Sequence, residues 1–587
     1  DSNPSNMLIS SKKRDESEVS SEQLILIFDS FNDKENGLGF ATTPTGLRSD
    51  FTISKDAMGM DGGPGHSPFN MSWNTFWDVK TTRNELGWFA ELRIPFSSMR
   101  FKDKDGKIVM GLICIRNIAH KNEVDIFPAI PPNWGPSSAY RPSKAQEVVF
   151  EGLKSRKPFY IAPYVIGGNQ ADYVLNEAAT AYDLKKSPKL NAGLDIKYGL
   201  TNNLTMDVTI NTDFAQVEAD DEQINLTRFS LFFPEKRTFF QERSSVFAFD
   251  FEPGGSLFYS RRIGLYEGEQ VPLLGGARIT GMAGKWDIGF MDMQTQAINQ
   301  GEGEINPLPS ENFGILRLRR QVVNENSYIG GIFTSRVGTD GSYNTAYGID
   351  GIIKIADNDY FNLKLAQVLD ESSPNKILSL EPTELFLSWN RFTQKGLNYN
   401  FTYARSGKDF NPGVGFMARN NYTHYYGGLG YGWIPGETSP LQSHQIGINA
   451  ISYFDNTDNS AQSFQTGIMY DFNFKSGYSG MFSINHMYEN VADTFSFSKE
   501  AYVPSGQYGF NEIETHLNSP KTNKFVVGID FWGGSFYDGS RLTFGLEPSW
   551  NIGSSLQLGL KYNHNFLKFS SRDQSFNGAV AGFKALI

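Results

Sequence analysis

The sequence predicts an all-β protein in two parts. We expect a β-sandwich over residues 1–150, a linker at 151–158, and a large antiparallel transmembrane β-barrel of about 20 strands over residues 159–587. Aromatic residues reach 14% and accompany 58 glycines, a mixture typical of strands and tight turns. Apolar and polar side chains alternate along segments of about ten residues, and short turns recur about every 40 residues. Together these observations predict membrane-crossing strands.

Composition excludes two broad classes. Only 39% of the residues are hydrophobic, and no run approaches the roughly 20 apolar residues that a membrane-spanning helix needs. A formal net charge of -11 argues against a nucleic-acid partner, because such proteins normally carry a basic surface. The single cysteine, Cys114, cannot form an internal disulfide and says nothing about the redox compartment.

The N-terminal part shows short apolar runs separated by Gly, Pro, Asn and Asp, the pattern of buried sandwich strands. The runs are Leu24 to Phe28, Trp77 to Val79, Trp88 to Ile94 and Ile108 to Ile115. Five prolines between Pro128 and Pro142 indicate irregular extended chain and a candidate linker into the second part.

The second part alternates with a period of two residues. Leu204, Met206, Val208 and Ile210 face one way and Thr205, Asp207, Thr209 and Asn211 the other, and the pattern recurs over residues 556–562. One face therefore suits lipid and the other suits water.

The connections also predict a barrel. Longer polar connections at residues 297–311, 370–382, 455–463 and 489–509 lie between short turns, in strict alternation, and outer-membrane barrels place short turns in the periplasm and long loops outside. The short turns are expected near Gly284, Asn324, Asp357, Lys395, Gly436, Ser476, Pro520 and Gly553. The strand count is even only if residues 215–272 add no crossing and begin and end on the outer side.

That segment carries clustered charges and many Phe residues. We expect it to fold inward as a plug, with charges of both signs paired in the lumen, against the alternative of a solvated outer loop. Lumen-facing partners are expected among residues such as Asp195, Asp207 and Lys561. The charged residues of the predicted cluster are Asp213, Glu218, Asp220, Glu235, Lys236, Arg237, Glu242, Arg261 and Arg262.

Two stretches of this segment carry a resemblance to a known family. Asp213-Phe-Ala-Gln-Val-Glu-Ala-Asp220, with Phe232-Phe-Pro-Glu-Lys-Arg-Thr-Phe-Phe-Gln-Glu242 and Tyr259-Ser-Arg-Arg-Ile-Gly264, resembles a bacteroidete-type outer-membrane β-barrel family of unknown function. The resemblance implies an N-terminal domain like family 9 carbohydrate-binding modules, and residues 77–79 and 87–96 are similar to the second half of such a module. The module's first strands are missing, so the sandwich is expected to be incomplete and the chain to be a fragment.

The resemblance makes three tryptophans candidates for stacking on sugar rings: Trp73, Trp77 and Trp88. Trp77 and Trp88 lie in apolar strand runs and are expected in the core. Trp73 follows a loop and is the better ligand candidate.

The functional prediction is an outer-membrane barrel that binds and transports glycan or another solute. The alternatives are a surface glycoside hydrolase and a structural or assembly component of the envelope. No catalytic residue, metal ligand or cofactor site is predicted; Asp220, Asp221 and Glu222 lack the spacing of a calcium loop. Expected partners are outer-membrane lipid, a glycan ligand and an envelope protein, with the N-terminal domain in the periplasm of a Gram-negative cell.

Overall fold

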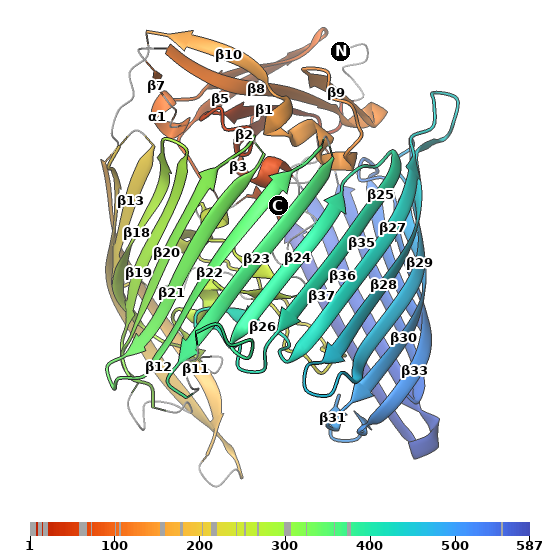
Figure 1. The fold of residues 1–587 in the computed structure, drawn as a ribbon. Helices are drawn as coiled ribbons and strands as arrows, with labels where there is room; N and C mark the ends of the chain where they lie inside the picture. The colour runs from red at the N-terminus through yellow and green to blue at the C-terminus, as the bar shows by residue number, and fades with distance from the viewer. Residues whose placement is uncertain are drawn as a thin grey trace.

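The computed structural model describes most of the chain. The described residues are 7–9, 14–15, 21–57, 67–71, 73–99, 101, 103–104, 107–152, 159–176, 180–201, 203–212, 220–241, 243–251, 254–266, 269–298, 307–324, 326–356, 358–372, 377–552 and 556–586. Among them, no helix is both long and apolar enough to cross a membrane. The fold is all-β, as predicted, and an N-terminal domain lies across one end of a large curved sheet (Figure 1).

The N-terminal domain is built on an eight-stranded antiparallel sheet. Apolar side chains alternate along its strands and fill both faces: Ile25 and Ile27 of β1 pack on one side, while Leu26 and Phe28 pack on the other. The hairpin of β5 (Asp78–Asn84) and β6 (Gly87–Arg93) and helix α1 (Phe96–Met99) cover the second face. The strands are β1 (Gln23–Asp29), β2 (Gly37–Thr42), β3 (Arg48–Ile53), β4 (Phe69–Asn70), β7 (Asp103–Lys104), β8 (Lys107–Ile118), β9 (Glu123–Phe127) and β10 (Gln146–Glu151).

The proline-rich stretch from Pro128 to Pro142 is not a linker, which corrects the expectation. It forms a 3₁₀ helix at Gly135–Tyr140 that packs on the sheet, and strand β10 of the same sheet follows it. The buried Arg141 donates through Nε to Asp56 at 2.9 Å, and the Ser143 amide donates to the same carboxylate at 2.9 Å. A paired and fully hydrogen-bonded charge of this kind holds the stretch in the domain.

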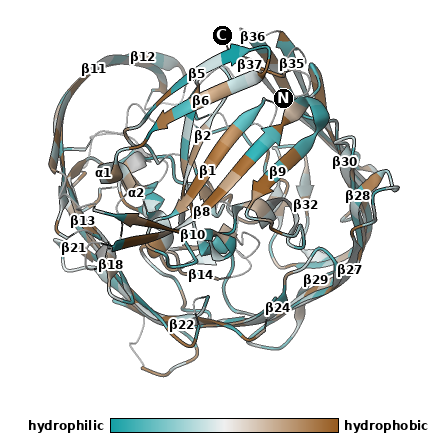
Figure 2. Cartoon of the chain, turned by 90° about the horizontal axis from the view of Figure 1, so that it is seen from above, coloured by the Kyte–Doolittle hydropathy of each residue, from teal (hydrophilic) through white to brown (hydrophobic). Residues whose placement is uncertain are grey.

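The second part is a 20-stranded antiparallel sheet, which confirms the predicted number of strands. Its strands are β11 (Phe159–Leu175), β12 (Tyr182–Gly199), β13 (Leu204–Ile210), β18 (Leu273–Ala283), β19 (Trp286–Thr295), β20 (Glu311–Gln321), β21 (Tyr328–Gly338), β22 (Tyr343–Lys354), β23 (Asp359–Asp370), β24 (Thr383–Arg391), β25 (Gly396–Ser406), β27 (Tyr422–Trp433), β28 (Leu441–Asp455), β29 (Ala461–Phe474), β30 (Ser479–Val491), β33 (Gly506–Asn518), β34 (Phe525–Phe536), β35 (Gly539–Ile552), β36 (Leu556–Phe569) and β37 (Gln574–Leu586). The sheet curves into a ring in which β11 and β37 are the two edge strands (Figure 2).

Six of the eight predicted short turns are described, and these six fall between paired strands at one end of the ring, hereafter the short-turn end. The other two, Asp357 and Gly553, lie outside the described residues. Strict alternation of short and long connections is wrong, because residues 339–342 and 570–573 make short connections at the opposite end, hereafter the long-loop end. The hairpin of β11 and β12 extends beyond the long-loop end (Figure 1).

Residues 211–272 leave and re-enter the sheet at the long-loop end, because Ile210 of β13 pairs with Gly275 of β18. We call residues 220–266 the inner segment. It contains α2 (Thr238–Gln241), β14 (Asp250–Phe251), β15 (Gly255–Ser256) and β16 (Leu265–Tyr266), with β17 (Glu269–Gln270) just beyond. Phe247, Phe249 and Phe251 are buried with Phe313 and Phe386 of the sheet in one hydrophobic cluster. Helix α2 and β14 lie inside the ring (Figure 2).

Candidate functional site at the junction of domain, inner segment and barrel

The predicted charged cluster forms two ion-pair groups within the inner segment. Arg237 is buried and forks onto Glu235 at 2.8 and 2.6 Å, while its two Nη atoms also donate to the carbonyls of Ile263 and Ser260. Burial alone would raise the pKa of Glu235, but the hydrogen bonds from Arg237 and Ser260 lower it below its usual range. A carboxylate and a guanidinium joined by two parallel hydrogen bonds hold the surrounding chain in one conformation.

The second group joins Asp220 to Arg261 and Lys236. Arg261 donates to both Asp220 oxygens at 3.0 and 2.5 Å, and these bonds lower the pKa of the carboxyl. Lys236 Nζ lies 3.5 Å from the same side chain. Arg262 instead donates to the Gly415 carbonyl at 3.0 Å. Asp213, Glu218 and Glu242 lie outside the described residues.

The expected partners of these charges were wrong. Within the part of the chain that the structure describes, the ion pairs of Glu235, Lys236, Arg237 and Arg261 join residues of the segment itself. Asp207 of β13 is held by wall residues, with Arg278 Nη2 at 2.9 Å and Lys197 Nζ at 3.6 Å. Arg278 is one link from wall to segment, because it also donates to the Phe239 carbonyl and lies over its ring at 4.9 Å. Arg228 of the segment is another, since its Nη2 atom lies 2.9 Å from Glu489 Oε2 of β30.

Other contacts tie the N-terminal domain to the short-turn end and to the inner segment. Trp134 Nε1 donates to Asn358 in the turn before β23 at 2.8 Å. Asn122 donates to the Lys475 carbonyl at 2.7 Å, and Asn70 donates to the Gln241 carbonyl at 2.8 Å. The N-terminal domain therefore contacts two turns of the short-turn end and the inner segment.

A charged contact lies at the same junction. Arg319 of β20 pairs with Asp287 of β19, and its Nη1 atom lies 3.7 Å from Glu35 Oε1 of the N-terminal domain. Burial, with smaller contributions from Asp33 and Asp287, raises the pKa of Glu35 from 4.5 to about 7, against the opposing effect of Arg319.

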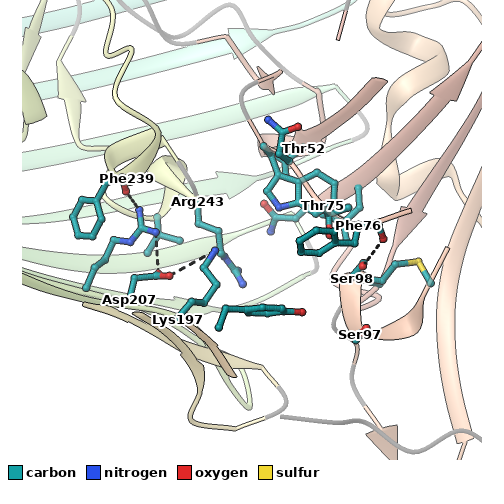
Figure 3. Close-up of a pocket in the computed structure, with 18 of the residues that line it drawn as sticks. Thr52, Thr75, Phe76, Ser97, Ser98, Lys197, Asp207, Phe239 and Arg243 are labelled. Carbon is teal, nitrogen blue, oxygen red and sulfur yellow. Dashed lines mark hydrogen bonds and ion pairs between the residues drawn. The ribbon is translucent and has the colours of Figure 1, made fainter. Parts of the chain in front are cut away.

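A cavity of about 550 Å³ lies where the domain, the inner segment and the first barrel strands meet. We call it the junction cavity. Phe76 and Ser98 line one side, while Lys197, Asp207 and Phe239 line the other, with Arg243 between them (Figure 3). Its size is within the range of small-molecule sites, and apolar side chains share its lining with polar and charged ones.

The aromatic residues of the cavity come from two parts of the chain. Phe76 precedes β5 and is 72% exposed; its ring stacks on Tyr160 of β11 with centroids 6.1 Å apart. Trp73 also lines the cavity, yet it is only 9% exposed and packs edge-on against Phe40. Phe76 is thus the accessible ring on the side of the N-terminal domain.

The expected burial is confirmed for Trp77 and wrong for Trp73 and Trp88. Trp73 and Trp77 are both in the core, whereas Trp88 is half-buried under the Arg116 guanidinium at 5.1 Å. Their binding of sugar stays a prediction. Sequence reasoning placed Asp207 on the water-facing side of its strand and counted Arg243 among the clustered bases of residues 215–272. It did not find Lys197 and Arg278 as members of a site, because they come together with Arg243 only in the fold. Among the described residues, no group of three His, Cys, Asp or Glu residues is arranged to hold a metal ion.

No curated protein sequence matches the chain. Solved structures similar to it include the outer membrane protein OpdK of Pseudomonas aeruginosa, 9% identical over 54% of this chain and 94% of that one, with a TM-score of 0.31. OpdQ of Pseudomonas aeruginosa is 9% identical over 73% and 96% of the two chains, with a TM-score of 0.30. The translocation pore of the P pilus usher PapC is 8% identical over 96% and 98%, with a TM-score of 0.29.

A family model matches residues 169–580, which cover the barrel and its inner segment. The match begins after the N-terminal domain, so the resemblance of residues 1–150 to carbohydrate-binding modules and the bacteroidete type stay predictions. Over most of its length, the chain belongs to the family described as Domain of unknown function (DUF5916).

Proposed function

We propose that this protein is an outer-membrane β-barrel that binds a small solute in the junction cavity and passes it across the membrane when the inner segment moves. The cavity carries the proposal. It is bounded by three separate parts of the chain, so any displacement of the domain or the segment changes its walls.

The outward faces of the sheet support a membrane location. On β20, Ile315, Arg317 and Arg319 are buried, while Leu316 and Leu318 between them are exposed. Other strands expose apolar residues in the same alternation, among them Phe361, Leu363, Leu365, Ile446, Ile448, Ile468 and Ile484. An apolar outer band on strands of this length is the signature of a transmembrane barrel. The short turns then face the periplasm, and the N-terminal domain lies on that side.

The lumen is covered at both ends. The N-terminal domain covers the short-turn end. At the other end, β15 of the inner segment pairs with β26 (Phe416–Met417), which lies in the loop after β25. Nearby, Phe495 and Val503 of the loop before β33 pack with Leu226 of the inner segment. These covers support a gated path rather than a permanently open pore.

Planar-bilayer recording tests the gated path. We expect the whole protein to conduct little in the absence of solute. In a second protein a short Gly-Ser linker replaces residues 220–262, and we expect this variant to conduct steadily, because the inner segment no longer fills the lumen. Heat-modifiable migration on a gel shows that each protein is folded. Steady conductance by the unaltered protein, or none by the folded linker variant, would contradict the proposal.

A binding panel tests the solute. Glycans are the class expected from the resemblance, and small amphipathic acids are the class favoured by the exposed Phe76 ring and by Arg243 in the cavity lining. Calorimetry with the protein in nanodiscs measures the binding of each class. Analysis of the glycans after the titration shows whether they have been hydrolysed. Binding that survives replacement of Phe76 and Arg243 would place the solute elsewhere.

A further inference from the structure

The two edge strands of the sheet leave a seam in the wall. Every backbone residue of β11 and β37 is described, and in this described part no strand pairs with the free edge of either. β11 starts at the short-turn end and β37 finishes there, so the two edges run antiparallel. Inside a membrane an unpaired backbone N–H or C=O costs several kcal/mol. Because no backbone pair joins the two edges in the described part of the chain, a molecule that enters here breaks none of the pairs that hold the rest of the wall, and it can meet the unpaired groups with its own polar atoms.

The residues of the edge strands also favour a weak junction. Pro163 of β11 has no N–H to donate, and proline within sheets is found mainly on edge strands. β37 carries Gly578, Ala579, Ala581 and Gly582, and residues with a methyl side chain or none offer little cross-strand contact. On its paired side, β37 has larger cross-strand partners: Phe566 of β36 lies opposite Asn577, and Leu567 lies opposite Phe576.

The junction cavity reaches this seam. Tyr160, Ile161 and Ala162 of the edge strand line the cavity, and all three are exposed. Phe76 stacks on Tyr160, so apolar rings from the domain and from the edge strand meet at this corner. A molecule bound here would touch both the cavity and the lipid-facing edge.

The opposite wall of the cavity is charged. Lys197 and Arg278 are paired with Asp207, while Asp287 is paired with Arg319. Asp195 accepts a hydrogen bond from Thr209 at 2.6 Å. Arg243 forms no ion pair with any residue that the structure describes and lies over the Phe31 ring at 5.6 Å. Arg243 is therefore the cation available to an incoming anion. A ligand that satisfies both walls has an apolar body and an acidic head.

We infer that the seam between β11 and β37 is a lateral doorway, through which an amphiphile with an acidic head passes between the periplasmic leaflet and the junction cavity. This inference rests on the proposed function, because it assumes that the cavity binds a solute. It adds the chemical class of the solute and its route.

Lipid access to the cavity wall tests the doorway. A bimane label is placed at Ala162→Cys in a Cys114→Ser background, and the protein is reconstituted in vesicles of dioleoyl phosphatidylcholine or of its brominated form. The matched control is Asp471→Cys, which faces inward on the central strand β29 at a comparable distance from the short-turn end. Ile349→Cys, exposed on the outer face of β22, gives the signal for full lipid contact.

We expect bromine to quench the label at Ala162 nearly as strongly as that at Ile349, and the label at Asp471 hardly at all. Quenching at Ala162 as low as that at Asp471 would overturn the doorway, since it would show a wall closed to lipid. If the Ala162→Cys variant does not show heat-modifiable migration, the label is placed instead at Tyr160→Cys, two residues away on the same strand and lining the same cavity.

Ligand binding is measured separately with laurate and with maltose in nanodiscs. We expect laurate to bind and maltose not to, and Arg243→Ala to weaken laurate about tenfold, as loss of a charge-assisted hydrogen bond does, while Arg243→Lys retains most of the affinity. Laurate binding without quenching at Ala162 would refute the doorway and leave the proposed function standing. Binding of maltose alone would refute the acidic amphiphile as the solute. Binding of neither laurate nor maltose would refute both the acidic amphiphile and the binding of a solute in the junction cavity.

Discussion

At the scale of single residues, Trp73 shows how a tertiary contact decides a role that local sequence cannot. Its position after a loop predicted an exposed, ligand-binding ring, but Phe40 on a distant strand buries it. We expect Trp73→Ala to lower the free energy of unfolding of the N-terminal domain by about 3–5 kcal/mol, as core truncations of large aromatic residues do. Denaturation of the whole protein followed by proteolysis of that domain measures the loss.

The matched control for Trp73 is Leu86→Ala, because Leu86 is exposed in the turn between β5 and β6. We expect its effect to stay within about 0.5 kcal/mol. Equal losses from the two variants would show that Trp73 is not a core residue.

Glu35 makes the stability of the junction depend on pH. Burial raises its pKa from 4.5 to about 7, so the folded protein holds this proton more tightly than the unfolded chain. Its stabilising contribution is complete below pH 4.5 and is lost as the pH rises through about 7. We therefore expect the melting temperature of the domain to fall between about pH 5 and about pH 8, and to fall less in Glu35→Gln. The same decrease in both proteins would rule out Glu35 as the titrating group.

At the scale of elements, the strands were predictable because their signals are local. Alternation along a strand and a turn at its end are written in neighbouring residues, and these placed the 20 strands. The Pro128 to Pro142 stretch was misjudged, because its role depends on Asp56 far away in the sequence. The site was predictable only in its types of residue, because Arg243, Lys197 and Phe76 come from three separate parts of the chain.

The inner segment should depend on its buried ion pair. Arg237→Ala removes the guanidinium that pairs with Glu235 and donates to the carbonyls of Ile263 and Ser260, and breaking a buried pair costs about 3–5 kcal/mol. We expect more frequent channel openings in single-channel recordings. Lys236→Ala is the control, because its contact with Asp220 is longer and more exposed, and exposed pairs contribute about 0–1 kcal/mol. Equal opening in both variants, or in neither, would contradict the role of Arg237.

At the scale of the whole molecule, the account depends on a sheet that spans the outer membrane with its N-terminal domain in the periplasm. Both ends of this arrangement carry exposed positions. Ala492 lies in the loop after β30 at the long-loop end, and Leu86 lies in the N-terminal domain. Placed on opposite sides of a membrane, the two positions should differ in their accessibility to a reagent that cannot cross it.

The most direct test is cysteine labelling in intact cells with a membrane-impermeant maleimide, in a Cys114→Ser background. We predict rapid labelling of Ala492→Cys in intact cells, and labelling of Leu86→Cys only after the outer membrane has been permeabilised. Labelling of Leu86→Cys but not Ala492→Cys in intact cells would reverse the orientation. Recovery of the unlabelled protein as a water-soluble monomer without detergent would contradict the membrane barrel itself.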